Sequence, residues 1–343
     1  MKQLKNSLNY KIIFRCDAAY KPEIGTGHLY RCVRIANYLK NEFNIKKNQI
    51  IFVIKYGGEY LIASKILKKY GYNYYKLDKK IKNNSFQESN ILTKFKSKLL
   101  IIDRLGKTNK IFVEKIKKSC RKKIIFEDSS CFRNLFDLSI NSLIRNVKKD
   151  KNSKIGFKFL LLSHKKISSK KIKKNSVFLF FGGFDKNNYQ SKVLELLNLI
   201  NFRLNIFISK SNKNNLYKKI SKHKIDFFDT RSYENKLKSS NIVFNSGGIG
   251  LFDSILMNKK IICIPQYNHQ KINAKTVSKL GAINLFTNLS KINKKKIIRT
   301  FLSIYEDKNY ESKVFDIQKK IINYDMVKRN YNMICSIYKN AKI

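Results

Sequence analysis

The sequence predicts an α/β protein with two doubly wound domains that face each other across a cleft. Short runs of β-branched and aromatic residues recur along the chain, and helical stretches separate most of them. This alternation is typical of parallel sheets whose two faces are covered by helices. Three glycine-rich segments each follow one of the runs, where a loop between a strand and a helix is expected.

The first half of the chain contains six predicted strands. They lie at residues 12–15, 50–54, 74–77, 99–103, 124–127 and 138–141. A helix is predicted after the first strand, over residues 29–42, because Leu29, Val33, Ala36 and Leu39 recur at the spacing of one helix face. We therefore expect a doubly wound domain here.

The second half repeats the pattern after a looser segment. Lysine and serine clusters between about residues 146 and 175 place the domain boundary there, so that the domains are residues 1–150 and 151–343. Six further strands are predicted at residues 176–181, 204–208, 225–228, 242–245, 261–264 and 282–286. The lysine-rich end of the chain has the apolar spacing of amphipathic helices that pack one face on a core.

The charge of the chain does not by itself name a partner. Lysine and arginine total 73 against 23 acids, which gives a formal net charge of +50. The excess is nearly all lysine and accompanies abundant Asn, Ile and Tyr, as an AT-rich coding sequence would produce. A nucleic-acid-binding protein is the alternative of another class, but stacking platforms and known motifs are missing. We expect no specific nucleic acid, a weak association with anionic membrane surfaces, and a monomer.

The cysteine pattern and the hydropathy of the chain predict a reducing compartment. The six cysteines show no C-x-x-C spacing, so we expect reduced thiols, no structural metal and no cofactor. No apolar run approaches the roughly 18 residues that a membrane helix needs, and the first residues lack an apolar signal core. These features predict a cytoplasmic protein.

Polar residues follow several strands of the first half. Asp17 follows the first strand and Asp103 ends the fourth, while Glu127 ends the fifth. In open parallel sheets, ligands bind at the carboxyl ends of the strands, so these acids together predict a polar ligand. Each acid taken alone is more often a helix cap or a solvated loop residue. An acid at this edge could orient a sugar or a histidine.

The segment from Gly25 to His28 is the sharpest candidate site. Gly25 and Gly27 allow a backbone to approach a bound group, and the following helix start offers free N–H donors. A histidine in the first turn of a helix is kept neutral by the helix dipole and can serve as a general base. On the same helix, Arg31 either reaches a phosphate or lines a solvated face. A dinucleotide site is disfavoured because the third glycine of its fingerprint is absent.

Two further glycine loops lie in the second half. Gly182 and Gly183 follow its first strand, and Ser246, Gly247 and Gly248 follow its fourth. This arrangement fits a pyrophosphate at a helix N-terminus. The same series suggests a ribose held by Asp253, one helical turn further on. A polar loop with Asn268, His269 and Gln270 comes after the next strand and is a candidate substrate contact.

At these residues the chain resembles the GT-B glycosyltransferase-like group. The likeness is greatest to the UDP-sugar hydrolase of pseudaminic acid synthesis and to the related spore-coat polysaccharide proteins, and covers about residues 10–287. The segments that carry it are 14–17, 24–32, 100–104, 126–128 and 137–141. The resemblance implies two Rossmann-like domains, the first with the catalytic loop and the second with the nucleotide.

The activity that the resemblance implies is the inverting hydrolysis of a UDP-linked diacetamido-trideoxy sugar, in the synthesis of a nonulosonic acid or a surface polysaccharide. His28 would activate the water. Asp17, which follows the first strand, is predicted as a second catalytic residue. Asp253 departs from the family, which usually has Glu there, and His269 with Gln270 replaces an Asn-Gln pair. Residues 273–282 look more like the transferases. A GT-B glycosyltransferase with a UDP-sugar donor, acting in cell-surface polysaccharide synthesis, is therefore the alternative.

Overall fold

The computed structural model describes residues 8–21, 24–144, 146–163, 172–183, 185–210, 214–307 and 309–341. The chain separates into two compact units. The first unit is formed by residues 1–164 with residues 325–343, and the second by residues 165–324. Each unit contains a parallel sheet with helices on both faces, so the predicted α/β class with two doubly wound domains is confirmed.

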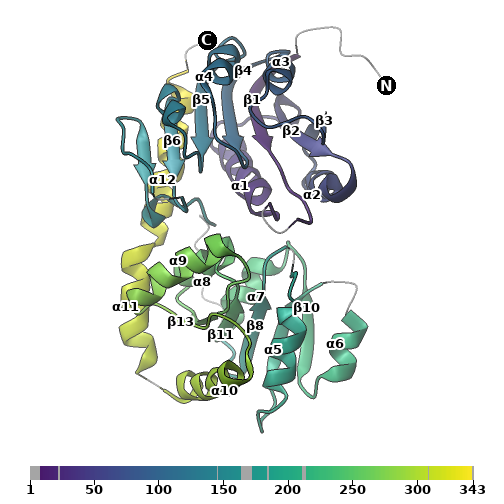
Figure 1. Ribbon diagram of the computed structural model, residues 1–343, viewed down its shortest axis with the longest axis vertical. Helices are drawn as coiled ribbons and strands as arrows, with labels where there is room; N and C mark the ends of the chain where they lie inside the picture. The colour runs from purple at the N-terminus through teal and green to yellow at the C-terminus, as the bar shows by residue number, and fades with distance from the viewer. Residues whose placement is uncertain are drawn as a thin grey trace. The chain divides into compact units, whose positions relative to one another are not determined.

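The first unit is built on a sheet in which seven strands fall within the described residues, in the order β3-β2-β1-β4-β5-β6-β7 (Figure 1). Its strands are β1 (Leu8–Cys16), β2 (Ile50–Tyr56), β3 (Asn73–Asp78), β4 (Phe95–Asp103), β5 (Cys120–Phe126), β6 (Leu138–Asn141) and β7 (Ser153–Ile155). Its helices are α1 (Gly27–Glu42), α2 (Leu61–Tyr70), α3 (Phe86–Leu92), α4 (Lys110–Ile116) and α12 (Tyr324–Lys339). The central strands are apolar on both faces because both are covered, and Ile12, Ile13 and Phe14 are fully buried.

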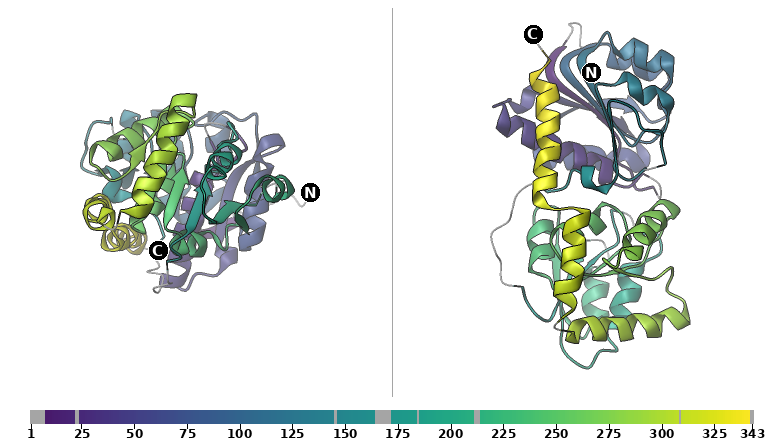
Figure 2. Two further views of the ribbon diagram at one scale, coloured as in Figure 1. Left: turned by 90° about the horizontal axis from the view of Figure 1, so that it is seen from below. Right: turned by 90° about the vertical axis from the view of Figure 1, so that its left-hand side faces the viewer.

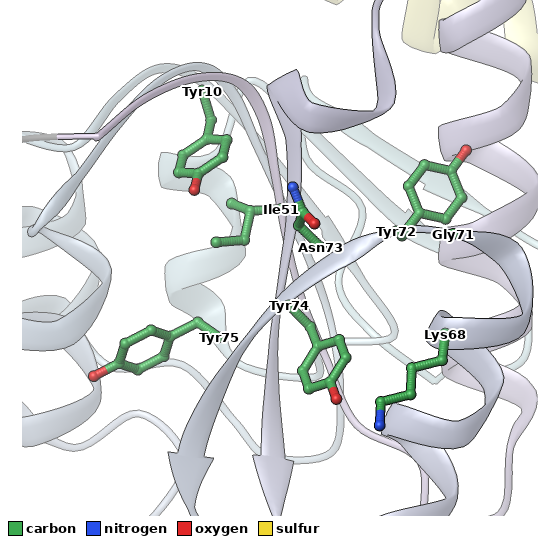
Figure 3. Close-up of a pocket in the computed structure, with 8 residues that line it drawn as sticks. All are labelled: Tyr10, Ile51, Lys68, Gly71, Tyr72, Asn73, Tyr74 and Tyr75. Carbon is green, nitrogen blue, oxygen red and sulfur yellow. The ribbon is translucent and has the colours of Figure 1, made fainter. Parts of the chain in front are cut away.

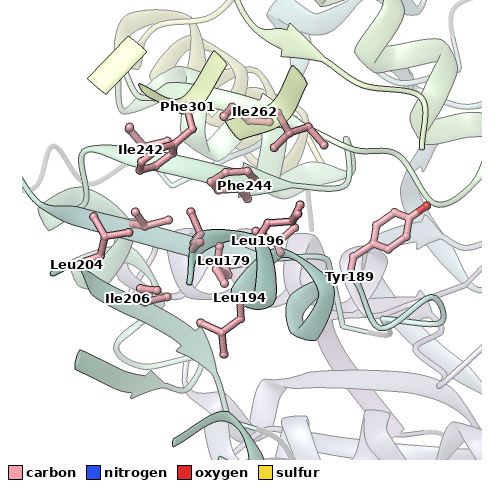
Figure 4. Close-up of a cluster of buried hydrophobic side chains, with 14 of the residues drawn as sticks. Leu179, Tyr189, Leu194, Leu196, Leu204, Ile206, Ile242, Phe244, Ile262 and Phe301 are labelled. Carbon is pink, nitrogen blue, oxygen red and sulfur yellow. The ribbon is translucent and has the colours of Figure 1, made fainter. Parts of the chain in front are cut away.

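The second unit has a similar strand topology, and its described strands follow the order β10-β9-β8-β11-β12-β13. Its strands are β8 (Ser176–Phe180), β9 (Asn205–Ser209), β10 (Lys224–Phe228), β11 (Ile242–Asn245), β12 (Lys260–Cys263) and β13 (Asn284–Leu285). Its helices are α5 (Tyr189–Leu197), α6 (Asn214–Ile220), α7 (Tyr233–Ser239), α8 (Ile249–Leu256), α9 (Asn268–Lys279), α10 (Lys291–Glu306) and α11 (Tyr310–Ile321). Leu179, Ile206 and Phe244 lie in its core with Leu194 of α5 and Phe301 of α10 (Figure 4).

The end of the chain joins the first unit, whereas the sequence analysis assigned it to the second domain. Tyr331 of α12 stacks on Tyr38 of α1 at 4.5 Å between ring centroids, and its hydroxyl donates to the Leu162 carbonyl at 2.9 Å. Figure 2 shows this helix, in yellow, beside the strands of the first unit. An amphipathic pattern predicts that a helix buries one face, but it does not say against which core.

All twelve predicted strands are present in the predicted order, with ends that differ by a few residues. The strand β7 is an addition, since its three residues lie in the lysine- and serine-rich segment interpreted as a linker. Two of these residues are only partly buried, which leaves no apolar signal in the sequence.

Candidate functional site

The strand order of the first unit defines where a ligand site is expected. The chain winds outward in one direction from β1 through β2 to β3, and in the other from β4 through β7. Loops that follow β1 and β4 therefore diverge at the carboxyl ends of these two strands and leave a crevice between them. His28 follows β1 and Asp103 is the last residue of β4, so both belong to this switch point.

The loop between β1 and α1 is held by backbone hydrogen bonds, within the loop and to the segment that follows β2. Ala19 N–H donates to the Gly25 carbonyl at 2.9 Å, and Tyr20 N–H donates to the Glu59 carbonyl at 3.1 Å. Gly25 has a φ of +56°, which favours glycine, while nothing lies within 4 Å of the position a Cβ would take. Glycine is thus favoured at position 25 by the backbone conformation, and not because a side chain would clash with a neighbour. Gly27 begins α1, which makes His28 the second residue of the helix.

A carboxylate orients the His28 ring. Nδ1 of His28 lies 2.7 Å from Oδ1 of Asp103, and 16% of the histidine side chain is exposed. A buried carboxylate accepts the Nδ1 proton and thereby selects the tautomer with Nε2 as the acceptor. Nε2 makes no hydrogen bond with any residue that the structure describes. The predicted histidine is therefore held in one orientation by Asp103, with its second nitrogen available.

Arg31 fixes the carboxylate that orients the histidine. Its Nε donates to Oδ2 of Asp103 at 2.6 Å and its Nη2 donates to Oδ1 at 2.7 Å, which is the bidentate geometry of a strong ion pair. The guanidinium lies 4.9 Å from the centroid of the Phe126 ring. With only 2% of its side chain exposed, Arg31 positions Asp103, and these contacts differ from the phosphate contact considered for it from sequence.

Glu127 anchors the other side of Arg31. Its Oε1 accepts from Nη1 of Arg31 at 3.1 Å and from the Ser142 hydroxyl at 2.6 Å, and its Oε2 accepts from Leu143 N–H at 3.0 Å and from Ile144 N–H at 2.9 Å. Its backbone has a φ of +53°, which is rare for a residue with a side chain and costs about 1–2 kcal/mol. Such strain persists where surrounding contacts over-determine the conformation, as these four do.

The ion pairs set the protonation of this site. Burial by itself would raise the pKa of Asp103, but the charge of Arg31 and the hydrogen bonds from Arg31 and His28 hold it well below its usual range. Burial would lower the pKa of Arg31, whereas Asp103 and Glu127 raise it above its usual value. Asp103 and Arg31 are therefore both ionised at neutral pH, and Asp103 remains an acceptor for His28.

Asp17, predicted as a catalytic residue, has different neighbours. Its two oxygens accept from Nη1 and Nη2 of Arg15 at 2.7 and 3.0 Å, and Oδ1 also accepts from Lys55 N–H at 3.0 Å. Arg15 in turn donates from Nε to Glu88 at 2.6 Å. Arg15 overcomes burial and lowers the pKa of Asp17. The structure thus brings His28, Arg31 and Asp103 together, while it places Asp17 in a separate ion-pair cluster.

Sequence reasoning missed the partners of Asp17. Arg15 is the polar member of a strand, and Glu88 is in the first turn of α3, where Ser85 Oγ caps the Glu88 N–H at 3.2 Å. The spacing Ser-x-x-Glu is a common helix start, so it gave no reason to suspect a buried ion pair. The signal that was available is an arginine inside an otherwise apolar strand, since a fully buried guanidinium requires carboxylate partners.

The glycine loops of the second unit meet at its own switch point, between β8 and β11. These strands are paired with Phe180 opposite Asn245, so the loops that follow them are neighbours. The position of a Cβ on Gly182 lies 3.9 Å from the Ser246 hydroxyl oxygen, and Gly182 has a φ of +90°. Gly183 continues the same loop. Four of the predicted binding residues are therefore grouped at this edge: Gly182, Gly183, Ser246 and Gly247.

The second glycine loop packs closely on the start of α9. A Cβ on Gly247 would lie 2.9 Å from the Gln270 carbonyl oxygen, and a Cβ on Gly248 would lie 3.7 Å from Nε2 of Gln270. Gly247 also has a φ of +82°. Oε1 of Gln270 accepts from Gln266 N–H at 3.0 Å, and Nε2 of Gln266 donates to the Phe181 carbonyl at 3.0 Å. The loops that follow β8, β11 and β12 therefore form one polar edge. None of the contacts named here involves a charged side chain.

The remaining predicted residues of the second unit differ in exposure. Asp253 of α8 is buried and accepts from the Tyr233 hydroxyl at 3.4 Å. Asn268 and His269 are exposed at the start of α9, and the His269 ring stacks on Tyr267 at 5.8 Å between centroids. Helix α8 begins with no side-chain cap, which leaves N–H groups of its first turn for water or a ligand.

An open cavity of about 500 Å³ lies at the opposite edge of the first sheet (Figure 3). Its wall includes Tyr10, Tyr72, Tyr74 and Tyr75, with Lys68 from α2. The amino ends of β2 and β3 border it, and none of the residues discussed above belongs to it. The residues that line it include no carboxylate, histidine or cysteine, so the candidate site remains at the carboxyl edge.

The described ranges contain neither a metal-binding cluster nor a membrane-spanning helix. No group of three or more histidine, cysteine or carboxylate side chains there is arranged to hold a metal ion. Among the described helices, none combines the length and the apolar content that a membrane span requires.

Two parallel α/β units, each with a polar switch point, are the fold of GT-B glycosyltransferases. The solved structures that resemble the chain include the spinosyn forosaminyltransferase SpnP, with a TM-score of 0.67 and 9% identity over 97% of this chain and 99% of that one. MurG of Acinetobacter baumannii has a TM-score of 0.64 and 11% identity over 95% and 99% of the chains. A UDP-glucosyltransferase of Polygonum tinctorium has a TM-score of 0.60 and 11% identity over 97% and 99%.

The sequence comparisons are more limited. No family model matches the chain. It is similar to the uncharacterised protein MJ1062 of Methanocaldococcus jannaschii, with 27% identity over 276 residues, which are 73% of this chain and 54% of the relative. The chain thus spans about half the length of the curated relative it matches.

Proposed function

We propose that the protein is a glycosyltransferase that takes its sugar from a nucleoside diphosphate sugar such as a UDP-sugar. The observation that carries the proposal is the contact between His28 Nδ1 and Asp103 Oδ1 at 2.7 Å, in a chain with the GT-B fold. Arg31 fixes the position of Asp103. The pair supplies a base, and the fold is one whose similar structures include a UDP-glucosyltransferase and a forosaminyltransferase. The comparisons favour transfer to an acceptor over hydrolysis.

In this proposal His28 removes the proton of the attacking hydroxyl. The acceptor oxygen forms a bond to the anomeric carbon, and the bond from that carbon to the phosphate oxygen breaks, so that its electron pair leaves with the nucleoside diphosphate. The proton passes to Nε2 of His28, and Asp103 stabilises the resulting imidazolium. Direct displacement inverts the anomeric configuration.

We assign the nucleotide to the second unit. Its polar edge offers the glycine loops at Gly182 and Gly247, together with the uncapped start of α8. Backbone N–H groups at such positions bind phosphate oxygens and stabilise charge that develops on a leaving group. Asp253, one turn into α8, remains the candidate contact for the ribose.

Hydrolysis of a UDP-linked diacetamido-trideoxy sugar is the second candidate. It uses the same base, with water as the attacking group, and is supported by the likeness of the segment around His28 to the hydrolases. The His28 geometry serves either nucleophile, so the acceptor decides between the two reactions. The hydrolase would act in the synthesis of a nonulosonic acid or a surface polysaccharide. The transferase would act in cell-surface polysaccharide synthesis.

The test measures UDP release from a panel of UDP-sugars, including UDP-N-acetylglucosamine and a UDP-linked diacetamido-trideoxy sugar, with and without a mixture of sugar acceptors. Transfer predicts release that depends on an acceptor, and hydrolysis predicts equal release in buffer alone. His28→Asn should lower turnover by about 10²-fold or more, with UDP affinity unchanged. Wild-type turnover by this variant would remove His28 as the base.

A further inference from the structure

A second group of buried charges lies at the carboxyl edge of the first sheet. It consists of Arg15, Asp17, Lys55, Glu88 and Arg104, and we name it the Arg15 cluster. Each of the five residues is at most 8% exposed. The cluster contains three cations and two carboxylates, which leaves one positive charge in excess. An uncompensated charge at this depth is unfavourable, so its partner needs to be found.

The two carboxylates of the Arg15 cluster are already occupied. Asp17 accepts from both terminal nitrogens of Arg15 and from the backbone of Lys55. Glu88 accepts from Nε of Arg15 at 2.6 Å and from Nη2 of Arg104 at 2.6 Å, and it also accepts from Asn84 N–H at 2.5 Å. Neither carboxylate forms an ion pair with the Lys55 ammonium in the described part of the chain.

The Lys55 ammonium has an aromatic neighbour in place of an acid. Its Nζ lies 5.7 Å from the centroid of the Tyr60 ring, and Nζ of Lys21 lies at the same distance from that ring. Lys21 is largely exposed and pairs with Glu59, whereas Lys55 is not paired in this way. A cation over an aromatic ring gains about 0.5–2 kcal/mol, which is less than the several kcal/mol that burial of an ion costs.

Arg104 has unused donors in the same cluster. Its Nη2 donates to Glu88 and to Asn84, but its buried Nε has no hydrogen-bond partner among the described residues. Burial lowers the pKa of Lys55, and the charges of Arg15 and Arg104 act in the same direction against the pull of Asp17. Two cations of the Arg15 cluster are therefore incompletely satisfied: Lys55 in β2 and Arg104 directly after β4. These two strands flank β1.

We infer that Lys55, together with Arg104 of the same cluster, forms a subsite for an anionic oxygen group, a carboxylate or a phosphate, on a sugar that the first unit binds. That the carrier is a sugar rests on the proposed function, while the charge count stands without it. An ammonium with free protons binds either anion as a point charge. The anion would supply the negative charge that the Arg15 cluster lacks.

The experiment measures the affinity of three sugars by calorimetric titration. D-glucuronate carries a carboxylate, D-glucose 6-phosphate carries a phosphate, and D-glucose is the neutral control. At least one anionic sugar should bind the wild-type protein, and Lys55→Met should weaken its binding by about tenfold or more. Lys55→Arg should retain binding, and the matched variant Lys21→Met should equal wild type. Whichever anionic sugar loses affinity identifies the source of the charge.

A second measurement does not depend on the ligand. Without any sugar, Lys55→Met should raise the melting temperature, because a methionine of similar volume carries no charge to bury. Lys21→Met should leave it unchanged. A lower melting temperature for Lys55→Met would overturn the inference, since it would make Lys55 a structural cation. Absence of binding of both anionic sugars to wild type, or equal affinity for Lys55→Met, would overturn it as well.

Failure of the inference can be told apart from failure of the proposed function. Saturating UDP is added in a parallel titration, which occupies any phosphate seat in the second unit. Sugar-dependent UDP release with an unchanged Lys55→Met affinity would remove the subsite alone. Loss of anion affinity in that variant without any UDP release would remove the transferase alone.

Discussion

The two units share one strand topology, but charged residues occupy the switch point of the first unit and uncharged groups occupy that of the second. In both sheets the first strand of the unit lies beside the fourth, and the loops after these two strands meet. The first unit fills this position with buried charge, notably Arg15, Arg31 and Asp103, whereas the second fills it with glycines, a serine hydroxyl and glutamine amides. A similar backbone thus presents one fixed imidazole in the first unit and backbone donors in the second.

The difference indicates a division of labour between orientation and access. Buried ion pairs contribute little net stability, because desolvation offsets much of their attraction, but they hold side chains in one geometry. Glycine loops leave N–H groups accessible to an anion and cannot orient a catalytic side chain. Under the proposed function, the first unit would then supply the aligned base and the second the nucleotide seat.

Low pH should produce the largest difference in stability between the two units. The pKa values of Asp17, Glu88 and Asp103 are all held below their usual 3.8 and 4.5 by paired arginines, although burial opposes this. A lowered folded-state pKa contributes stability that is present above the usual value and is lost as the pH falls through the folded value. Below about pH 4.5 the first unit should therefore lose stability progressively, and more steeply than the second.

Hydrogen–deuterium exchange resolved by peptide measures this acid effect. After correction for intrinsic exchange rates, β1 and β4 should lose protection at a higher pH than β8 and β11, whose loops lack such a network. Strands β8 and β11, which contain no charged residue, are the internal control. Equal loss of protection in both sheets would contradict the assignment of the buried charge to the first unit.

Much of the fold could be predicted from sequence because its signals are local. Apolar runs placed every strand except β7, whose three residues lack an apolar pattern. The motif around His28 singled out the histidine that Asp103 contacts, and a strand-end acid was expected to orient a sugar or a histidine. The choice of Asp103 for that task and the pairing of Asp17 with Arg15 were not predictable. Asp103 lies 75 positions from His28 and is brought to it by the strand order. Arg15 and Asp17 are only two positions apart, but their ion-pair cluster is completed by Glu88, 73 positions from Arg15.

Asp103→Asn tests the orientation of the base directly. The substitution removes the charge that pairs with Arg31 and leaves a buried guanidinium incompletely compensated, at a cost of about 3–5 kcal/mol in unfolding free energy. Turnover of a nucleotide sugar should fall by about 10²-fold or more, because His28 loses its orienting acceptor. Urea unfolding and UDP release measure the two effects.

The matched control for this variant is Asp137→Asn. Asp137 pairs with Lys122 at 2.8 Å, accepts from Lys123 N–H at 2.8 Å and is 19% exposed, so its loss should cost less than that of the fully buried Asp103. It precedes β6 and has no contact with His28 among those described, so turnover should be preserved. Wild-type turnover by Asp103→Asn, in a variant that remains folded, would show that Asp103 does not orient the base.

A pair of glycine substitutions compares the two switch points at the smallest scale. Gly247→Ala in the second unit meets a φ of +82° and the Gln270 carbonyl oxygen at 2.9 Å, so it should cost about 2–3 kcal/mol and weaken UDP binding. Gly25→Ala in the first unit meets a φ of +56° with open space around the new methyl group, so only the backbone term of about 1 kcal/mol remains.

Urea unfolding measures the cost of each glycine substitution, and calorimetric titration with UDP measures its effect on nucleotide binding. Gly25→Ala should leave UDP affinity unchanged. An equal cost for both variants would mean that the glycine loop of the second unit is no more closely packed than that of the first. Unchanged UDP affinity in a folded Gly247→Ala protein would move the nucleotide away from the switch point of the second unit.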